Sequence, residues 1–201
     1  MMSQLIFATN NAHKLFEIRN LLKDSSFKIK GLKECGIDEE IPEDYDTLEE
    51  NAMQKARHIF KRTGEDCFAD DTGLEISALN GEPGVYSARY SRIGKPVYPE
   101  MEATEGNIRK VLEKMDGADD RSAQFRTVIA LILDGREFRF EGIVKGCIGK
   151  QRHGDEGFGY DPIFIPEGME QTFAELPVSE KNKISHRAHA MRKLVDFLEN
   201  V

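Results

Sequence analysis

The feature that most constrains the fold is a long apolar strand followed at once by a returning strand. Residues 123–133 are strongly apolar, and the run from Val128 to Leu133 is unbroken. Asp134-Gly135 comes next, and this dipeptide is a strong signal for a two-residue hairpin turn. Residues 137–141 then alternate between charged and aromatic side chains, the period of a half-buried strand. The sequence therefore predicts an antiparallel pair of strands, with the second strand continuing to Ile148.

Further strands and helices are predicted on the N-terminal side of this hairpin. Residues 4–8 and 27–31 are predicted as short strands, and apolar residues at helical spacing run from Leu15 to Leu22 between them. Thr47 and Glu50 have the spacing of a capping box, and the helix that they begin is expected to end at Gly64. Lys55 and Arg57 are placed on faces of this helix other than the buried one.

Two more helices are predicted in the remaining chain. Pro99 is expected to open the first, because proline is favoured at the first helical position. The last helix is expected to bury a stripe that includes Ile184, Ala188, Met191 and Leu194.

The composition excludes several classes of protein. The chain has 201 residues and is 39% hydrophobic, which suits one globular domain with a real core. Its net charge of -8 makes a nucleic-acid polymer a poor partner. The sequence has no apolar run of membrane-spanning length and no signal-peptide pattern, so a cytoplasmic protein without a membrane partner is expected. Cys35, Cys67 and Cys147 are widely spaced and are expected to be reduced thiols.

Two adjacent acids, Asp70 and Asp71, stand between an apolar run and Thr72-Gly73. Neighbouring side chains on a strand point to opposite faces, so packing alone gives no reason for both acids. Buried carboxylates need a cation, a metal or backbone donors. One interpretation is a strand end that delivers the acids to a cleft, with Gly73 allowing a sharp bend. The other is a solvated turn, which the stretch taken alone favours.

A polar turn, residues 9–14, joins the first strand to the first helix. Free backbone N–H groups at a helix N-terminus bind anions, and Lys14 adds a positive charge. The turn is therefore a candidate phosphate site. An ordinary N-cap by Thr9 or Asn10 is an equal alternative.

Two later segments are candidates for contact with a ligand. Phe158 stands between glycines, which suits stacking on a base, although packing on the core is a serious alternative. Asp161 precedes a proline and is expected to be held extended. His186 and Arg187 lie off the buried stripe in the first turn of the last helix, where cations are unfavourable, which suggests an anionic or acceptor-rich ligand. A solvated His-Arg pair is the alternative, and this segment alone slightly favours it.

Together these segments resemble the inosine triphosphate pyrophosphatase family. The match spans nearly the full chain, and the order and spacing of the blocks carry it. Thr72 stands where many members have serine, and residues 43–46 replace a common Glu-Thr-Gly sequence. The matching blocks are Thr9 to Lys14, Glu43 ahead of Glu50-Asn51-Ala52, Ala69 to Leu74, Pro83 to Tyr90, Gly157 to Pro162, and Lys181 with Ser185-His186-Arg187.

The resemblance implies an α/β fold, with an elongated mixed β-sheet flanked by helices and two lobes with an active-site cleft between them. Residues 1–201 would form this single domain, which is usually a homodimer. It also implies Mg²⁺-dependent hydrolysis of noncanonical purine nucleoside triphosphates (ITP, dITP, XTP) to the monophosphate and pyrophosphate, which cleanses the nucleotide pool.

The resemblance also implies roles for individual residues. Asp71 would be the catalytic base, and Glu43, Asp71 and Asp70 would be the candidate ligands of Mg²⁺. The metal neutralises phosphate charge and prefers oxygen ligands. The substrate-binding residues would be Thr9, Asn10, Asn11, Ala12, His13, Lys14, Lys55, Thr72, Phe158, Gly159, Tyr160, Asp161, Lys181, His186 and Arg187.

The choice of base has a physical explanation. Hypoxanthine and xanthine carry an acceptor oxygen at C6, and the donors of Arg187 and His186 match it, whereas adenine presents an amino donor. Two other classes of protein are weighed against this function. An aspartyl-nucleophile phosphatase needs acids two residues apart and releases orthophosphate, whereas a nucleotide-binding module binds without turnover.

Overall fold

The structure is a computed structural model that describes residues 3–23 and 25–201. Residues 1, 2 and 24 of the predicted domain lie outside the described residues. The chain divides into two compact units. The first unit comprises Met1–Asp71, Thr127–Gly142 and Arg187–Val201, and the second comprises Thr72–Arg126 and Ile143–His186.

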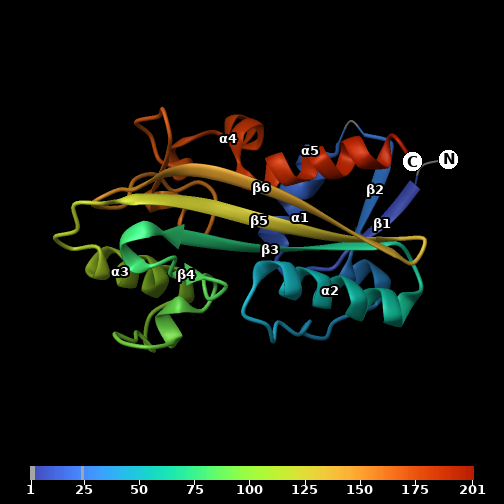
Figure 1. Cartoon of the computed structure of the whole chain (residues 1–201), viewed down its shortest axis with the longest axis horizontal. Helices are drawn as coiled ribbons and strands as arrows, with labels where there is room; N and C mark the ends of the chain where they lie inside the picture. Colours follow the sequence, from blue (N-terminus) through green and yellow to red (C-terminus); the bar gives the residue numbers. More distant parts are fainter. Residues whose placement is uncertain (1–2, 24) are drawn as a thin grey trace. The chain divides into compact units, whose positions relative to one another are not determined.

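Within the described residues the strands form one mixed, seven-stranded sheet (Figure 1). The order is β2-β1-β3-β5-β6-β7, and β4 pairs with β3. β1 is parallel to β2 and β3, whereas the β3–β4 and β6–β7 pairs are antiparallel. The strands are β1 (Ser3–Phe7), β2 (Phe27–Gly31), β3 (Cys67–Ile76), β4 (Pro83–Gly84), β5 (Ser122–Leu133), β6 (Arg136–Ile148) and β7 (Phe164–Pro166). A mixed α/β fold is thus confirmed.

The described residues form five α-helices and five short 3-10 helices. The α-helices are α1 (Ala12–Leu21), α2 (Leu48–Thr63), α3 (Ala103–Lys114), α4 (Val178–Ile184) and α5 (His186–Leu198). The 3-10 helices are η1 (Leu32–Cys35), η2 (Ser77–Leu79), η3 (Tyr90–Arg92), η4 (Asp161–Ile163) and η5 (Phe173–Glu175). None of the helices in residues 3–23 and 25–201 is both long and apolar enough to cross a membrane.

The core of the first unit lies between the strands and two of the helices. Phe7 of β1 stacks on Phe68 of β3, with ring centroids 4.7 Å apart. Ile18 of α1 and Met191 of α5 join the same apolar cluster. α2 covers the other face of these strands (Figure 1), with Ala56 and Ile59 among its buried side chains. Each face of the unit's strands is therefore covered, which leaves few places for a polar side chain without a partner.

The core of the second unit has a centre of its own. Phe125 of β5 packs against Phe164 of β7, with ring centroids 4.7 Å apart. Ile108 and Val111 of α3 and Ile148 of β6 belong to the same cluster. Each unit therefore has its own hydrophobic core.

Several predicted elements are confirmed with small shifts in their bounds. The hairpin forms as predicted, and Asp134 and Gly135 both have positive φ, as the tight turn requires. Thr47 caps α2 by accepting a hydrogen bond from the Glu50 N–H, and Gly64 ends it in the left-handed region.

Other predicted boundaries are wrong. α3 begins at Ala103 rather than Pro99, because the carboxylate of Glu102 accepts the N–H groups of Thr104 and Glu105. The last predicted helix is two helices, α4 and α5, separated by extended backbone at Ser185.

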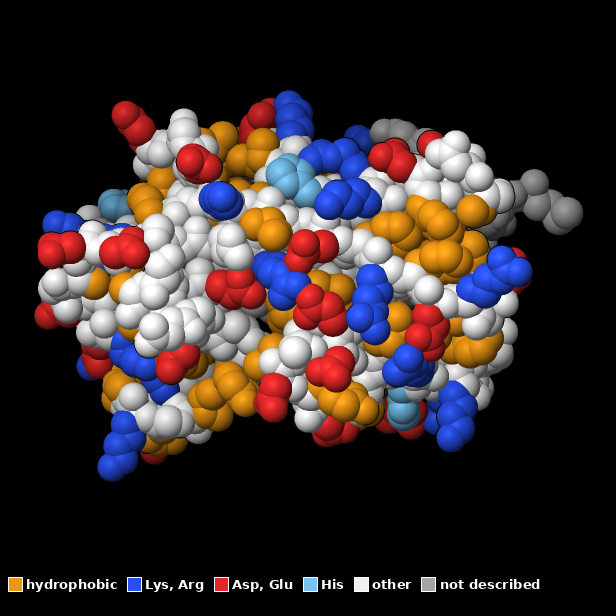
Figure 2. All heavy atoms as spheres, viewed as in Figure 1, with side chains coloured by type: hydrophobic (Ala, Val, Ile, Leu, Met, Phe, Trp, Pro, Cys, Tyr) orange, Lys and Arg blue, Asp and Glu red, His pale blue; other side chains and the backbone are white. Residues whose placement is uncertain are grey.

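Charged side chains of both signs are interspersed on the face shown in Figure 2. Buried charges are more informative about function than this mixed surface, and the first unit contains two groups of them.

Candidate active site

The two adjacent acids lie inside β3, where they are the fourth and fifth of its ten residues. Their side chains are buried, with Asp70 1% exposed and Asp71 7% exposed. The local backbone is neither a strand end nor a solvated turn, so both interpretations from sequence are wrong. Gly73 is not a sharp bend either, because it lies within β3. A Cβ there would lie only 2.7 Å from the Gly84 carbonyl oxygen, so glycine permits the close approach of β4. The alternation of β3 sends the acids to opposite faces, and each meets different partners.

Asp70 lies in a cluster with Lys14, Glu17 and Arg187, here called the Asp70 cluster. Lys14 Nζ is 3.0 Å from Asp70 Oδ1, and Arg187 Nε is 3.1 Å from Oδ2. Arg187 also pairs with Glu17, and both of these side chains are buried. Burial would raise the pKa of Asp70, but Lys14 and Arg187 outweigh it and hold this pKa well below its usual range. Asp70 is therefore a carboxylate kept charged by two cations.

Asp71 lies in a second cluster with Glu43 and Lys55, here called the Asp71 cluster. Lys55 Nζ is 3.0 Å from Asp71 Oδ1 and 2.6 Å from Glu43 Oε1. Burial raises the pKa of Asp71, and the Glu43 charge adds to this effect while Lys55 opposes it. Burial opposes the charge on Lys55 as well, but its two carboxylates outweigh burial and raise its pKa. The protonated form of Asp71 is therefore more favoured than that of an exposed aspartate.

The turn at residues 9–14 is tied to the Asp70 cluster through Lys14. Asn11, rather than Thr9 or Asn10, is the N-cap of α1, and it accepts the backbone N–H groups of His13 (2.9 Å) and Lys14 (3.1 Å). The Thr9 hydroxyl accepts the Asn11 N–H at 3.1 Å. An Asx cap of this kind leaves the N-terminal end of α1 beside a lysine, so the predicted phosphate role stays open.

The carboxylate oxygens of the Asp71 cluster are better suited to bind Mg²⁺ than those of Asp70. Glu43 and Asp71 direct carboxylate oxygens at one ammonium, whereas both oxygens of Asp70 are bound by cations. Among residues 3–23 and 25–201 no group of three or more His, Cys, Asp or Glu side chains could hold a metal ion. Mg²⁺ commonly binds one or two carboxylates and takes its other ligands from phosphates and water. The pair of Glu43 and Asp71 meets that requirement.

A group of predicted substrate-binding residues comes together in the second unit. Lys181 Nζ is 2.6 Å from Asp161 Oδ2, and it lies 5.1 Å from the centre of the Phe158 ring. Asp161 also accepts the Phe158 N–H at 2.8 Å. A Cβ at Gly157 would lie 2.1 Å from the Asp161 carboxylate, so only glycine fits there. Asp161 is in the 3-10 helix η4, which corrects the expected extended backbone, and its hydrogen bond orients the Phe158 loop.

Other predicted residues of the second unit have clear structural partners. Tyr160 is buried, and its hydroxyl donates to the Ser87 carbonyl oxygen at 2.9 Å. His186 is buried and stacks on Phe125 with ring centroids 4.6 Å apart, so it is not a solvated residue. Thr72 lies within β3, beside the catalytic candidate Asp71 in sequence, and Gly159 adopts positive φ in the Phe158 loop.

Comparisons with known proteins agree with the family resemblance. The family model described as the Ham1 family matches residues 5–197. The chain belongs to the Ham1 family. It is 47% identical over 197 residues to the dITP/XTP pyrophosphatase of Flavobacterium psychrophilum, covering 98% of this chain and all of the relative. The similarly named protein of Porphyromonas gingivalis is 52% identical over 198 residues, with 98% of each chain covered.

A solved structure supports the fold of this Ham1-family chain. The HAM1 protein from Coxiella burnetii matches with a TM-score of 0.85 and 40% identity, and the match covers 100% of both chains. The resemblance stated from sequence and the predicted fold class are thus confirmed.

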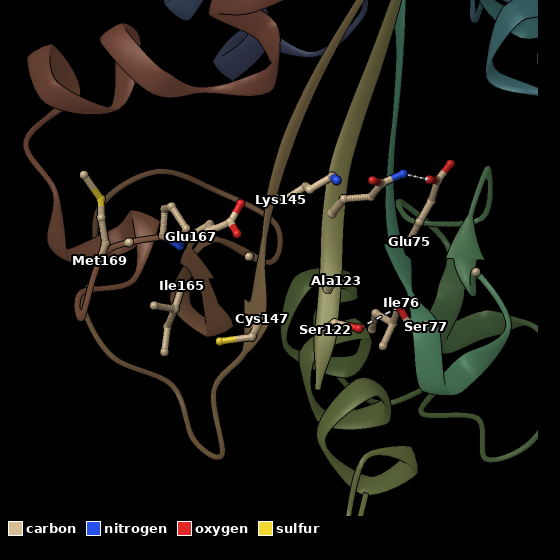
Figure 3. Close-up of a pocket in the computed structure, with 15 residues that line it drawn as sticks. Glu75, Ile76, Ser77, Ser122, Ala123, Lys145, Cys147, Ile165, Glu167 and Met169 are labelled. Carbon is tan, nitrogen blue, oxygen red and sulfur yellow. Dashed lines mark hydrogen bonds between the residues drawn. The ribbon is translucent and has the colours of Figure 1, made fainter. Parts of the chain in front are cut away.

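The second unit of this Ham1-family protein also has a hollow of about 710 Å³ on its strands (Figure 3). Gln124 donates to Glu75 across its floor, and Ser122 donates to Ser77. The side chains of Lys145 and Glu167 lie beside it. None of the catalytic, metal-binding or substrate-binding residues predicted from the sequence lines this hollow. It is therefore distinct from the clusters described above.

Sequence reasoning missed or misplaced three contributors to the site. Lys55 was placed away from the buried face of α2, yet it is 5% exposed. Arg187 was weighed as a possible solvated residue, yet it is 1% exposed and paired with two acids. Glu17 was not singled out. It follows Lys14 by three residues, and this spacing puts the two charges on one face of α1 and was a usable signal.

Proposed function

We propose that this chain hydrolyses noncanonical purine nucleoside triphosphates, with ITP, dITP and XTP as candidates, in an Mg²⁺-dependent reaction. Its relatives at 47% and 52% identity are named as dITP/XTP pyrophosphatases, and this chain is an enzyme of that class. The observation that carries the proposed mechanism is the Asp71 cluster. It combines a buried carboxylate of raised pKa with a second carboxylate, and both bind one lysine.

In the proposed reaction Asp71 is the general base. Its carboxylate takes a proton from the water whose oxygen forms a bond to the α-phosphorus. The bond between the α-phosphorus and the bridging oxygen breaks, and pyrophosphate leaves with the bonding electrons. A raised pKa suits a general base because it brings the carboxylate nearer to the pH at which the enzyme works.

Glu43 and Asp71 would hold Mg²⁺, which supplies neutralisation of phosphate charge when bound. Asp70, whose oxygens are bound by Lys14 and Arg187, would position these two cations instead. Lys14, Lys55 and the turn at residues 9–14 would bind the phosphates. These cations would attract an anionic substrate locally, although the chain as a whole is acidic.

Contacts to the base are proposed for Phe158 and Arg187. Phe158 would stack on the purine, and Lys181, held by Asp161, would fix that loop or bind phosphate. Arg187 is bound by Asp70 and Glu17, so its predicted contact with the C6 oxygen remains a proposal. The ITP-to-ATP rate ratio of Arg187→Ala tests it, since a ratio is insensitive to a general loss of active enzyme. An unchanged ratio would refute the role.

One experiment tests the proposed function. Wild-type enzyme is incubated with Mg²⁺ and ITP, dITP, XTP, GTP or ATP, and pyrophosphate and orthophosphate are measured separately. Pyrophosphate from the first three substrates, and little from ATP, is expected. Orthophosphate as the product would favour the phosphatase alternative, and tight ITP binding without turnover would favour a binding module.

Two further parts of the proposal concern the whole protein. The proposal includes a homodimer, which the sequence resemblance implies, and a cytoplasmic location. Light scattering on the purified chain tests the dimer, and a mass near 22.8 kDa, that of one chain, would contradict it.

A further inference from the structure

The loop that carries Glu43 has no regular secondary structure and is strongly acidic. It is called here the acidic loop, residues 39–46, and it contains Glu39, Glu40, Glu43, Asp44 and Asp46. Like charges at this density repel one another, and an irregular segment has no backbone ladder to fix it. Something other than the loop itself must set the place of Glu43.

One face of α2 provides that support, and its polar residues are called here the α2 stripe. Each member lies three or four residues from at least one other member, the spacing that keeps side chains on one face of a helix. The members of the α2 stripe are Asn51, Gln54, Lys55, His58 and Arg62.

The C-terminal part of the acidic loop is bound by two side-chain amides. Gln54 Oε1 accepts the Asp44 N–H at 3.0 Å, and Gln54 Nε2 donates to Asp44 Oδ2 at 2.6 Å. Asn51, which is 0% exposed, accepts the Tyr45 N–H at 2.9 Å and donates to the Tyr45 carbonyl oxygen at 3.0 Å. An amide suits this task because it offers both a donor and an acceptor without adding charge.

The N-terminal part of the loop is bound by charged members of the stripe. Glu39 is 2.9 Å from His58 Nε2 and 3.0 Å from Arg62 Nη1. The Glu39 carbonyl oxygen also accepts the side-chain amide of Asn10 at 3.1 Å, which links the loop to the candidate phosphate turn. Along α2 from residue 51 to residue 62, the loop partners run in the opposite direction, from residue 45 through 44 and 43 to residue 39. The loop therefore runs antiparallel to α2.

We propose that Gln54 and Asn51 are positioning residues that set Glu43 against Lys55 and Asp71, and thereby set the affinity of the Asp71 cluster for a divalent cation. The proposal rests on the proposed function in one respect, the role of Glu43 as a metal ligand. Glu43 immediately precedes the residue that Gln54 holds by two hydrogen bonds. Fixing a ligand in advance removes the ordering cost that binding would otherwise carry.

The test disrupts the Gln54–Asp44 contact with one substitution and rebuilds it with a second. Gln54→Glu keeps the acceptor for the Asp44 N–H but places a carboxylate against the Asp44 carboxylate. Added negative charge alone would strengthen cation binding, whereas a displaced Glu43 would weaken it. The double variant D44N/Q54E exchanges donor and acceptor and keeps the wild-type net charge, so it rebuilds the contact.

Binding of Mn²⁺ to the substrate-free enzyme is measured by calorimetry, with the melting temperature as a check on folding. Loss of the hydrogen bond from Gln54 Nε2 to Asp44 Oδ2, together with repulsion between the two carboxylates, predicts that Q54E raises the Mn²⁺ Kd about tenfold. We expect D44N/Q54E to return the Kd close to the wild-type value. The matched control is Arg57→Ala, because Arg57 is on another face of α2 and pairs with Glu137 of β6. Its Kd is expected to be unchanged.

The outcomes separate this proposal from the proposed function. If Glu43→Gln weakens Mn²⁺ binding but a folded Q54E binds like wild type or more tightly, the positioning role is wrong and the metal assignment survives. A double variant that stays as weak as Q54E also overturns the positioning role. If wild type does not bind Mn²⁺, or Glu43→Gln binds as tightly as wild type, the metal assignment fails and the positioning role fails with it.

Discussion

The Asp70 cluster and the Asp71 cluster begin at neighbouring residues of one strand, yet they differ in charge balance. In the first, Asp70 and Glu17 are matched by Lys14 and Arg187, so two anions meet two cations. In the second, Asp71 and Glu43 share Lys55, so two anions meet one cation. Among these ion pairs of the described residues, the charges of the first cluster are therefore equal, whereas the second cluster has one more anion than cation.

The pKa directions follow this balance. The pKa of Asp70 is lowered, so its charged form stabilises the fold above the ordinary aspartate pKa, and this contribution is lost as the pH falls through the lowered value. The pKa of Asp71 is raised, so its charged form costs stability at neutral pH, and that cost disappears as the pH falls through the raised value. Adjacent acids can therefore serve stability and chemistry separately.

The largest expected effect is on turnover when Asp71 is neutralised. Asp71→Asn removes the proton acceptor but keeps the shape of the side chain, so kcat for ITP should fall about a thousandfold. The melting temperature should stay close to that of wild type, because the charge removed is one that costs stability. Pyrophosphate release and thermal unfolding measure the two quantities, and near-normal turnover would refute the base assignment.

The contrast between these acids marks how far the sequence could predict the site. The resemblance identified both acids and Glu43, and strand periodicity implied that neighbouring acids face opposite ways. Their burial inside β3 was not predictable, because local pattern favours a turn where two acids precede Thr-Gly. The burial of Asp70 depends on its partners Lys14 and Arg187, which lie 56 and 117 residues away in the sequence. No local sequence pattern predicts these contacts.

The same limit explains which parts of the fold were predicted. The hairpin at Asp134-Gly135 and the caps of α2 depend on residues within a few positions, so sequence sufficed. Gly73 serves a close approach of β4, and Lys55 becomes buried because an acidic loop folds back on α2. Both depend on contacts between segments that are separate in sequence.

The second prediction removes the other acid. Asp70→Asn leaves the buried Arg187 and the half-buried Lys14 beside a neutral side chain, and breaking a buried pair such as Arg187–Asp70 costs about 3–5 kcal/mol. The free energy of unfolding from urea titration should therefore fall far more for Asp70→Asn than for Asp71→Asn. Equal losses in the two variants would show that the clusters do not differ as described.

A smaller effect separates the two acids directly in the wild-type protein. Carboxyl ¹³C shifts of the metal-free enzyme, assigned with the two Asn variants, should show Asp71 titrating above the ordinary aspartate pKa of about 3.9 and Asp70 below it. The cause is burial with one shared cation in one case and two cations in the other. The reverse order of the midpoints would contradict the assignment of roles.

The smallest expected effect concerns Lys55, and its sign is what matters. If the ammonium stands where a divalent cation would be attracted, Lys55→Met leaves Glu43 and Asp71 repelling each other, and Mn²⁺ should bind several-fold more tightly to the substrate-free enzyme. If Lys55 instead holds the two carboxylates in place, the same variant should bind Mn²⁺ more weakly. Turnover should fall in either case, since a predicted phosphate contact is lost, so binding rather than activity is the deciding measurement.

Arg57→Met is the control, because it removes a cation of α2 that pairs with Glu137 rather than with Glu43 or Asp71. Tighter binding by Lys55→Met alone would confirm that the Asp71 cluster is the one short of positive charge.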